Sequence, residues 1–136
     1  ERILLWDFVF IGSDSSLRAR EGILSEGKPH PRSYGTFSRV LGRFCREEKV
    51  LSVEKAIQKM TGLPAQKVGL ARRGLIREGY FADITIFHPE KITDKSTFTE
   101  PHQYSEGIEY VIVNGKITVS NGRHNGTTNG RILRKI

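Results

Sequence analysis

Apolar and polar side chains recur with a helical period beyond residue 36. One face of this stretch is apolar and carries Phe37, Val40, Leu41, Phe44 and Cys45. Another face is basic and carries Arg39, Arg43 and Arg46. This spacing predicts an amphipathic helix that begins near Thr36 and buries its apolar face against a core.

A second helix is predicted from Ser52, a good N-cap residue, to about Gly62. Its apolar residues follow the i, i+3, i+4, i+7 pattern, at Val53, Ala56, Ile57 and Met60. Pro64 then begins a short helix that runs to Val68, because proline suits a first helical turn. Gly69 follows and can end it.

The second half of the chain changes to an extended pattern. Its apolar runs are Ile84–Phe87, Tyr110–Val113 and Ile117–Val119. Asn114-Gly115 separates the last two runs and predicts a hairpin with a type I′ turn, which needs two positive φ angles. A second pair, Asn121-Gly122, is expected to end the last strand. From Arg123 onward we expect an extended or loosely ordered tail.

Near the start of the chain, a carboxylate follows a short apolar run. The run Phe8–Ile11 predicts a β-strand, and Gly12-Ser13 leads from it to Asp14. Enzymes of the α/β class place their chemistry at the carboxyl ends of strands. No set of histidines, cysteines and carboxylates with metal-ligand spacing accompanies Asp14, so we expect the rest of such a site to lie elsewhere.

Length and composition suit one ordinary domain of 136 residues. The chain begins at Glu1 without methionine, and the apolar residues that follow look like the inside of an element, so we expect an excerpt or a processed piece. The apolar stretch 3–11 is interrupted by Asp7 and is shorter than the about 20 residues that span a bilayer. It also lacks the features of a secretory signal. Neither a membrane span nor a signal is therefore predicted.

The single cysteine bears on the cellular compartment, and the net charge of +7 bears on the kind of binding partner. Cys45 lies among apolar residues at helical spacing, which favours a buried thiol and a reducing compartment, hence a cytoplasmic location. Basic residues run from Arg2 to Lys135 and alternate with acids, which favours a solvated surface over a nucleic-acid site. The arginines of the predicted helix keep phosphate binding open as an alternative.

Five segments in this order resemble the carboxyl-terminal part of the D-aminoacylase family, the N-acyl-D-amino-acid deacylases of the amidohydrolase superfamily. They are Phe8–Asp14, His30–Leu41 (HPRSYGTFSRVL), Leu51–Leu70, Gly79–Asp83 (GYFAD) and Tyr104–Gly115 (YSEGIEYVIVNG). The run HPRSYGTF is the segment that points to deacylases within the superfamily. Ser38 departs from the family, which often has proline at that position, and this leaves the start of the first helix open.

The resemblance implies an α+β fragment of a larger enzyme. Residues 1–72 would supply the last strand, the substrate loop and the helices at the end of a (β/α)8 TIM barrel. Residues 73–136 would supply the carboxyl-terminal strands of a small β-sandwich. Seven barrel strands would lie outside this chain, and the fragment would depend on them for stability, because a strand without neighbours exposes an edge.

The resemblance also implies zinc chemistry with the ligands outside this chain. Zinc lowers the pKa of bound water to about 7. Asp14 matches the aspartate that follows the last barrel strand, and would take the proton from that water and deliver it to the leaving nitrogen. Such a role is worth about 10²- to 10⁴-fold in rate. No metal ligand is assigned to this chain, because its histidines show no ligand spacing and Cys45 does not match the family's metal-binding cysteine.

A loop that would project over the same face carries the candidate substrate-binding residues His30, Arg32, Ser33, Tyr34 and Gly35. The Arg32 guanidinium could pair with a substrate carboxylate through two hydrogen bonds. Ser33 and Tyr34 could add hydrogen bonds, and Gly35 could let the backbone pass close to a ligand. An alternative is a structural loop in which Pro31 and Arg32 brace the following helix.

The leading hypothesis is the carboxyl-terminal portion of a zinc-dependent hydrolase that cleaves the amide of N-acyl-D-amino acids to a carboxylate and a D-amino acid. Its partners would be this small substrate and the rest of the barrel, with neither nucleic acid nor membrane, and the fragment alone would be inactive. The alternatives are a small basic nucleic-acid-binding module, whose binding would weaken steeply with salt, and a structural module without catalysis.

Overall fold

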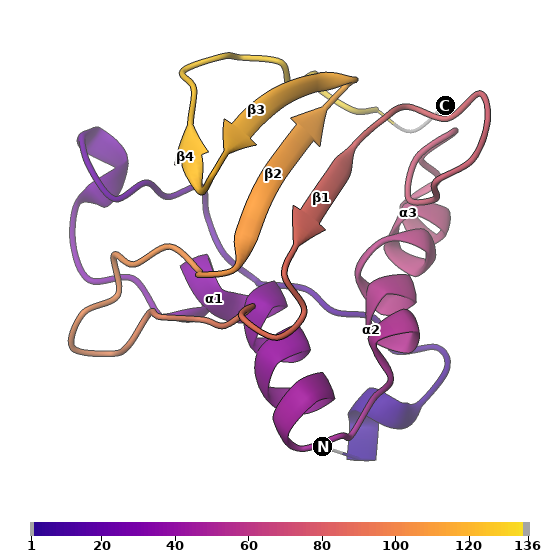
Figure 1. Ribbon diagram of the computed structural model, residues 1–136, viewed down its shortest axis with the longest axis horizontal. Helices are drawn as coiled ribbons and strands as arrows, with labels where there is room; N and C mark the ends of the chain where they lie inside the picture. The colour runs from indigo at the N-terminus through magenta and orange to yellow at the C-terminus, as the bar shows by residue number, and fades with distance from the viewer. Residues whose placement is uncertain (1, 135–136) are drawn as a thin grey trace.

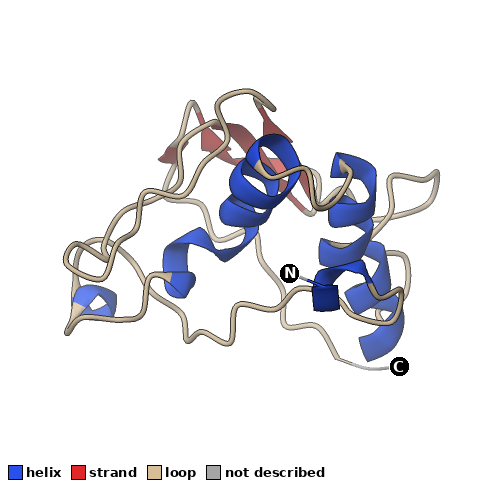
Figure 2. Cartoon of the chain, turned by 90° about the horizontal axis from the view of Figure 1, so that it is seen from below, coloured by secondary structure: helices blue, strands red, loops and turns tan. Residues whose placement is uncertain are grey.

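Helices occupy the first half of the chain and strands the second (Figure 1). A computed structural model describes residues 2–134. Four strands lie side by side at one end of the molecule, and α2 and α3 stand beside the α1 helix. Figure 2 shows long loops on the side of the molecule away from α2 and α3. Among residues 2–134, no helix has both the length and the apolar character needed to cross a bilayer.

The first long helix begins earlier than predicted. Helix α1 spans Arg32–Arg39 and continues without a break into η3, a π-helical stretch over Val40–Glu47. The predicted start near Thr36 is therefore wrong. Pro31 occupies the N-cap position with a helical φ of −51°, and the Ser33 amide donates to the His30 carbonyl at 2.9 Å. A proline at a helix start loses no hydrogen bond, so the helix begins directly after Pro31.

The second and third helices agree with the sequence pattern. Helix α2 spans Val53–Met60, and the Ser52 hydroxyl caps it by accepting the Lys55 amide at 3.2 Å. Helix α3 spans Gly62–Val68 and contains the predicted proline in its first turn. Gly69 ends it in the left-handed conformation, with φ 74°. Local capping chemistry was sufficient to predict both helices.

The strands form one antiparallel sheet in the order β1-β2-β3-β4. These strands span Ile84–Phe87, Ile108–Val113, Lys116–Ser120 and Arg123–His124. Val113 pairs with Lys116, so Asn114-Gly115 is the two-residue turn of a hairpin, with φ angles of 50° and 79°. The predicted type of turn, with two positive φ angles, is confirmed.

Asn121-Gly122 does more than end a strand. Its φ angles are 50° and 72°, and Ser120 pairs with Arg123 across it, so it forms a second tight turn that leads into β4. The first two residues of the predicted extended or loosely ordered tail are extended and pair with β3 as β4. Residues 125–134 contain neither helix nor strand, and residues 135 and 136 of the predicted tail lie outside the described part.

The predicted strand at Phe8–Ile11 does not form. The segment lies between two short 3-10 helices, η1 at Arg2–Leu5 and η2 at Ile23–Ser25, and has no regular structure. A strand is stable only when neighbours satisfy its backbone amides and carbonyls. In the described residues this segment is instead held by α2, because the Ile11 amide donates to the Lys59 carbonyl at 3.0 Å.

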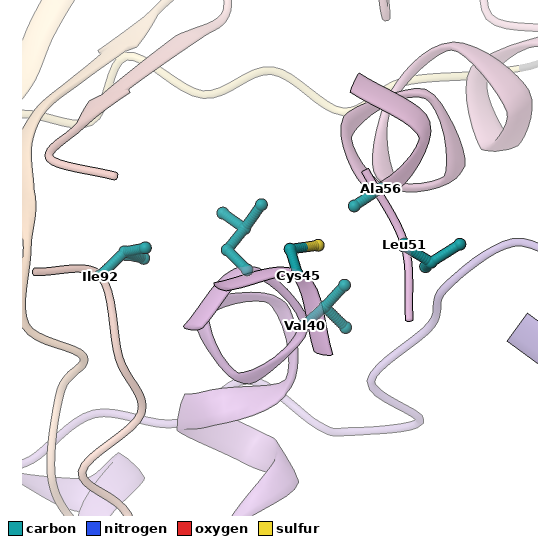
Figure 3. Close-up of a cluster of buried hydrophobic side chains, with 6 residues drawn as sticks. Val40, Cys45, Leu51, Ala56 and Ile92 are labelled. Carbon is teal, nitrogen blue, oxygen red and sulfur yellow. The ribbon is translucent and has the colours of Figure 1, made fainter. Parts of the chain in front are cut away.

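A single hydrophobic core joins the helices to the sheet side of the molecule (Figure 3). Its buried members are Val40, Leu41, Cys45, Leu51, Ala56 and Ile92. Phe87 of β1 and Ile108 of β2 pack against them. The predicted burial of Cys45 is confirmed, and this burial raises the pKa of the thiol. The two predicted portions of the chain, divided after residue 72, thus share one core, while residues 1, 135 and 136 of those portions lie outside the described part.

Candidate active site

Asp14 lies in an exposed turn. Its φ is 49°, in the left-handed region that aspartate tolerates better than most residues. The side chain is 89% exposed, and its Oδ2 forms an ion pair with a terminal nitrogen of Arg32 at 2.9 Å. The Arg32 Nε also donates to the Asp14 carbonyl at 3.1 Å. The structure therefore brings together two of the residues that the sequence predicted for one site.

His30 and Ser33 shape the beginning of helix α1 beside this pair. The Arg32 amide donates to His30 Nδ1 at 3.0 Å, and the Ser33 amide donates to the His30 carbonyl at 2.9 Å. The His30 ring stands edge-on to Phe98, with ring centres 4.9 Å apart. These contacts fix the turn from which Arg32 reaches Asp14.

Arg32 to Gly35 form the first turn of a helix, and the prediction that they lie in a long loop is wrong. The reason is the early start after Pro31, which orders the backbone that the sequence left open. The amides of a first helical turn need partners outside the helix, and here His30 and Pro31 accept all four of them. Arg32 is thus presented from a fixed backbone.

Tyr34 already uses its hydroxyl within the chain. It donates to the Ala19 carbonyl at 2.7 Å, and the ring lies near Tyr104 and His102 at 5.8 and 5.9 Å between centres. Burial chiefly raises the pKa of the Tyr34 phenol, Tyr104 adds to the increase, and Arg18 opposes it. This hydroxyl ties the segment before η2 to helix α1.

Gly35 is buried against the loop between β1 and β2. A Cβ at this position would lie 2.7 Å from the Cβ of Asp94. Glycine is required here by close packing within the chain. The approach to Asp94 is thus a reason for this glycine that involves no ligand.

Within residues 2–134, no group of three or more histidine, cysteine, aspartate or glutamate side chains could hold a metal ion. Of the residues that the sequence predicted for the site, Asp14 and His30 are the two whose side chains could bind a metal ion. Two donors fall short of the ligand set that zinc takes in enzymes, which is three protein ligands plus water. Residues 2–134 therefore do not make a zinc site by themselves.

The arginines of the nucleic-acid alternative are engaged within the chain. Arg39 pairs with Asp94 at 2.8 Å, and Arg43 pairs with Glu48. Arg46 donates to the Ile92 carbonyl at 2.6 Å. These contacts connect the helix to the β1–β2 loop and to the residue that follows η3. The three arginines therefore have a role in packing.

A mainly apolar groove lies away from the Asp14 pair. It has a volume of about 770 Å³ and lies between α1, α2 and β1. Its lining includes Phe37, Ile57, Leu75 and Ile84, and none of the predicted site residues. Because the groove contains none of the residues that the sequence predicted for the site, we place the candidate site at the Asp14 turn.

Sequence reasoning missed two residues around the site. Phe98 contacts His30 across 68 positions of the chain, and nothing in the local sequence announces such a pair. Lys59 is fully buried beneath the segment that leads to Asp14. It follows Ala56 by three positions, so helical periodicity would have placed it on the buried side.

Comparison with known proteins adds independent findings. Residues 23–119 match the amidohydrolase family. The chain is 42% identical to the N-acyl-D-aspartate deacylase of Alcaligenes xylosoxydans xylosoxydans over 132 residues, which cover 97% of this chain and 25% of the relative. It is 41% identical to the D-aminoacylase of the same organism over 133 residues, which cover 98% of this chain and 26% of the relative.

The solved structure of the N-acyl-D-glutamate deacylase from Bordetella bronchiseptica is also similar. The TM-score is 0.77 at 38% identity, over 90% of this chain and 25% of the other. That enzyme was solved with zinc and a phosphonate inhibitor that mimics the tetrahedral intermediate. The chain spans about a quarter of the length of the curated relatives that it matches.

Proposed function

The chain belongs to the amidohydrolase family, and from this premise we propose that it forms one part of a zinc-dependent N-acyl-D-amino-acid deacylase. The resemblance to the D-aminoacylases is confirmed, because three of these deacylases are at least 41% identical to the chain. The proposed enzyme cleaves the amide of an N-acyl-D-amino acid to a carboxylate and a free D-amino acid.

The single observation that carries the assignment to this site is the pair of Asp14 and Arg32. An acid for proton transfer and a cation for an anionic substrate are held 2.9 Å apart on an exposed turn. The pair involves Oδ2, and most of the Asp14 side chain stays accessible to a substrate. An exposed carboxylate next to a guanidinium suits a substrate that carries both an amide and a carboxylate.

In this proposal Asp14 moves the proton. Its carboxylate accepts a proton from the attacking water and delivers it to the leaving nitrogen as the amide C–N bond breaks. Arg32 holds the Asp14 backbone and carboxylate, and its remaining N–H groups can receive the substrate carboxylate. Zinc, when bound by residues outside this chain, supplies the polarisation that makes water a nucleophile near neutral pH.

The finer architecture is proposed in the same way. Residues 1–72 would belong to the end of a (β/α)8 barrel and residues 73–136 to a β-sandwich. The change from helices to strands between Val68 and Ile84 supports this division. A cytoplasmic location is proposed because the sole cysteine, Cys45, is a buried free thiol.

The test uses a chimaera in which this chain replaces the matching quarter of the N-acyl-D-aspartate deacylase from Alcaligenes. Asp14→Asn in this chimaera should lower kcat by about 10²- to 10⁴-fold, because the amide cannot accept the proton. The zinc content should not change, since Asp14 is not proposed as a ligand. Turnover of N-acetyl-D-aspartate and metal analysis measure the two quantities.

Asp7→Asn is the matched control. Asp7 lies in the same segment, is also exposed and also forms an ion pair, with Lys55 at 2.7 Å. Its kcat should stay within about twofold of the unsubstituted chimaera, because exposed ion pairs contribute little. Full activity of the Asp14→Asn chimaera would refute the role of Asp14.

A further inference from the structure

Lys59 is an unusual buried charge. Among residues 2–134, the buried polar side chains are those of Ser38, Lys59 and Ser96, and Lys59 alone carries a charge. It lies on α2 with none of its surface exposed. An ammonium group removed from water is costly unless hydrogen bonds replace its hydration. The contacts of this group therefore explain why a lysine occupies the position.

Those contacts all lead to one segment. The Lys59 Nζ donates to the carbonyls of Trp6 and Val9 at 2.5 and 2.7 Å. The Lys59 carbonyl in turn accepts the Ile11 amide at 3.0 Å. Three hydrogen bonds from a single residue thus fasten residues 6–11 to helix α2.

Burial works against the charge of Lys59, and its two donated hydrogen bonds compensate for lost hydration. Burial chiefly lowers the pKa of Lys59, the nearby Lys55 lowers it further, and Asp7 opposes the change. Hydrogen bonds donated by a charged group are roughly twice as strong as neutral ones. Residues 6–11 have no strand partner in the described chain. Lys59 therefore supplies the Trp6 and Val9 carbonyls with hydrogen bonds that a neighbouring strand does not provide.

The fastened segment leads directly to Asp14. Beyond Ile11 only Gly12 and Ser13 intervene, and at Asp14 the backbone carbonyl is held again by Arg32. The segment is therefore held before the turn by Lys59, with an ion pair between Asp7 and Lys55 beside it, and at the turn by Arg32. A displacement before the turn moves the turn, because a short stretch of backbone transmits it.

We propose that Lys59 is a positioning residue for the deacylase reaction, which fixes residues 6–11 and thereby the place of the Asp14 carboxylate. This inference rests on the proposed function of Asp14. Lys59 touches no reacting atom in this proposal. Because it acts through Asp14, which moves the proton, it affects the chemical step and not the capture of substrate.

The test compares Lys59→Met with Lys55→Met in the chimaera defined above. Methionine keeps the apolar stem of Lys59 and removes the donor, so the segment shifts. A misplacement of about 1 Å costs about 10²-fold in rate, and we expect that loss in kcat, with KM and zinc content unchanged. Lys55→Met removes a partly exposed lysine from the same helix and its ion pair with the exposed Asp7, and kcat should stay within about twofold.

A double variant separates positioning from general stability. If Lys59 acts through Asp14, adding Lys59→Met to Asp14→Asn should lower kcat by less than about twofold further, because the group being positioned is already disabled. The same 10²-fold loss in both backgrounds would overturn the proposal. An active Asp14→Asn chimaera would instead refute the proposed function itself, so the two failures are distinguishable.

Lys59→Arg serves if Lys59→Met does not fold. Arginine retains a charged donor for the Trp6 and Val9 carbonyls, so kcat should fall by less than about tenfold while circular dichroism stays normal. A loss of about 10²-fold in this variant, with normal circular dichroism and zinc content, would overturn the proposal.

Discussion

At the scale of single residues, the candidate side chains divide by what they already bind. The Tyr34 hydroxyl already donates to the Ala19 carbonyl, and close packing against Asp94 requires glycine at position 35. Their positions favour the structural alternative that the sequence left open for the HPRSYG run. Arg32 differs, because it contacts Asp14 and is still partly exposed. Arg32 is therefore the member of the group for which we keep a role toward substrate.

Arg32→Lys in the chimaera tests that role. Lysine has one nitrogen in place of the guanidinium fork, so it cannot serve Asp14 and a substrate carboxylate in the same geometry. We expect KM for N-acetyl-D-aspartate to rise about tenfold, equivalent to about 1.4 kcal/mol of binding. Steady-state kinetics measure the change.

The control for this variant is a substrate in which both carboxylates of N-acetyl-D-aspartate are converted to amides. Its KM should change by less than about twofold on Arg32→Lys, because no substrate anion remains for the arginine to bind. Equal increases in KM for both substrates would contradict a contact between Arg32 and the carboxylate.

At the scale of elements, the helix formed by α1 and η3 organises the molecule. It presents its apolar face to the core, while Arg39 and Arg46 on other positions reach the β1–β2 loop. Gly42 allows the closest approach, since a Cβ there would lie 2.6 Å from the Ile92 carbonyl oxygen. A backbone oxygen cannot move aside as a side chain can, so this contact fixes the helix against the loop.

Gly42→Ala should therefore destabilise the chimaera by about 1–3 kcal/mol through overpacking. Gly62→Ala is the matched control, because it is also a helical glycine and its Cβ would meet a methyl group of Leu75 at 3.3 Å and the Gly74 carbonyl oxygen at an ordinary 3.6 Å. The control should be neutral or slightly stabilising, since alanine favours helix. Thermal unfolding followed by circular dichroism compares the two, and equal melting temperatures would contradict the packing argument.

At the scale of the whole molecule, many large apolar side chains of residues 2–134 are exposed. Ile23 and Ile76 are 82% and 89% exposed, and the groove between α1, α2 and β1 is lined mainly by apolar side chains. Large exposed apolar patches mark surfaces that contact other protein. This agrees with a chain that spans about a quarter of the length of its relatives.

The isolated 136 residues should be inactive. Assayed with zinc and N-acetyl-D-amino acids, they should show no turnover above the buffer rate, because the described residues contain no metal-ligand cluster. The unsubstituted chimaera, assayed in parallel, shows that the same residues support turnover once the remaining part is present. Turnover by the chain alone would contradict a site completed from outside.

The sequence was most informative where one residue type demands one local geometry. Ser52 predicted its helix, Gly69 its end, and Asn114-Gly115 its hairpin, because capping and positive φ angles are set by neighbouring residues. The prediction of a strand at Phe8–Ile11 was wrong for the opposite reason. Its apolar pattern suits a strand, but a strand requires partners that no local pattern supplies, and among residues 2–134 it has none.

By itself, the sequence determined the helices after Ser52, the β2–β3 hairpin, the burial of Cys45 and the resemblance to the deacylases. The tertiary structure alone decided that Arg32 pairs with Asp14, that the Tyr34 hydroxyl donates to a backbone carbonyl, and that Lys59 holds the segment before Asp14. The first group depends on backbone preferences and periodicity within one or two turns. The second depends on which distant backbone groups lack partners, and that is settled only when the chain packs.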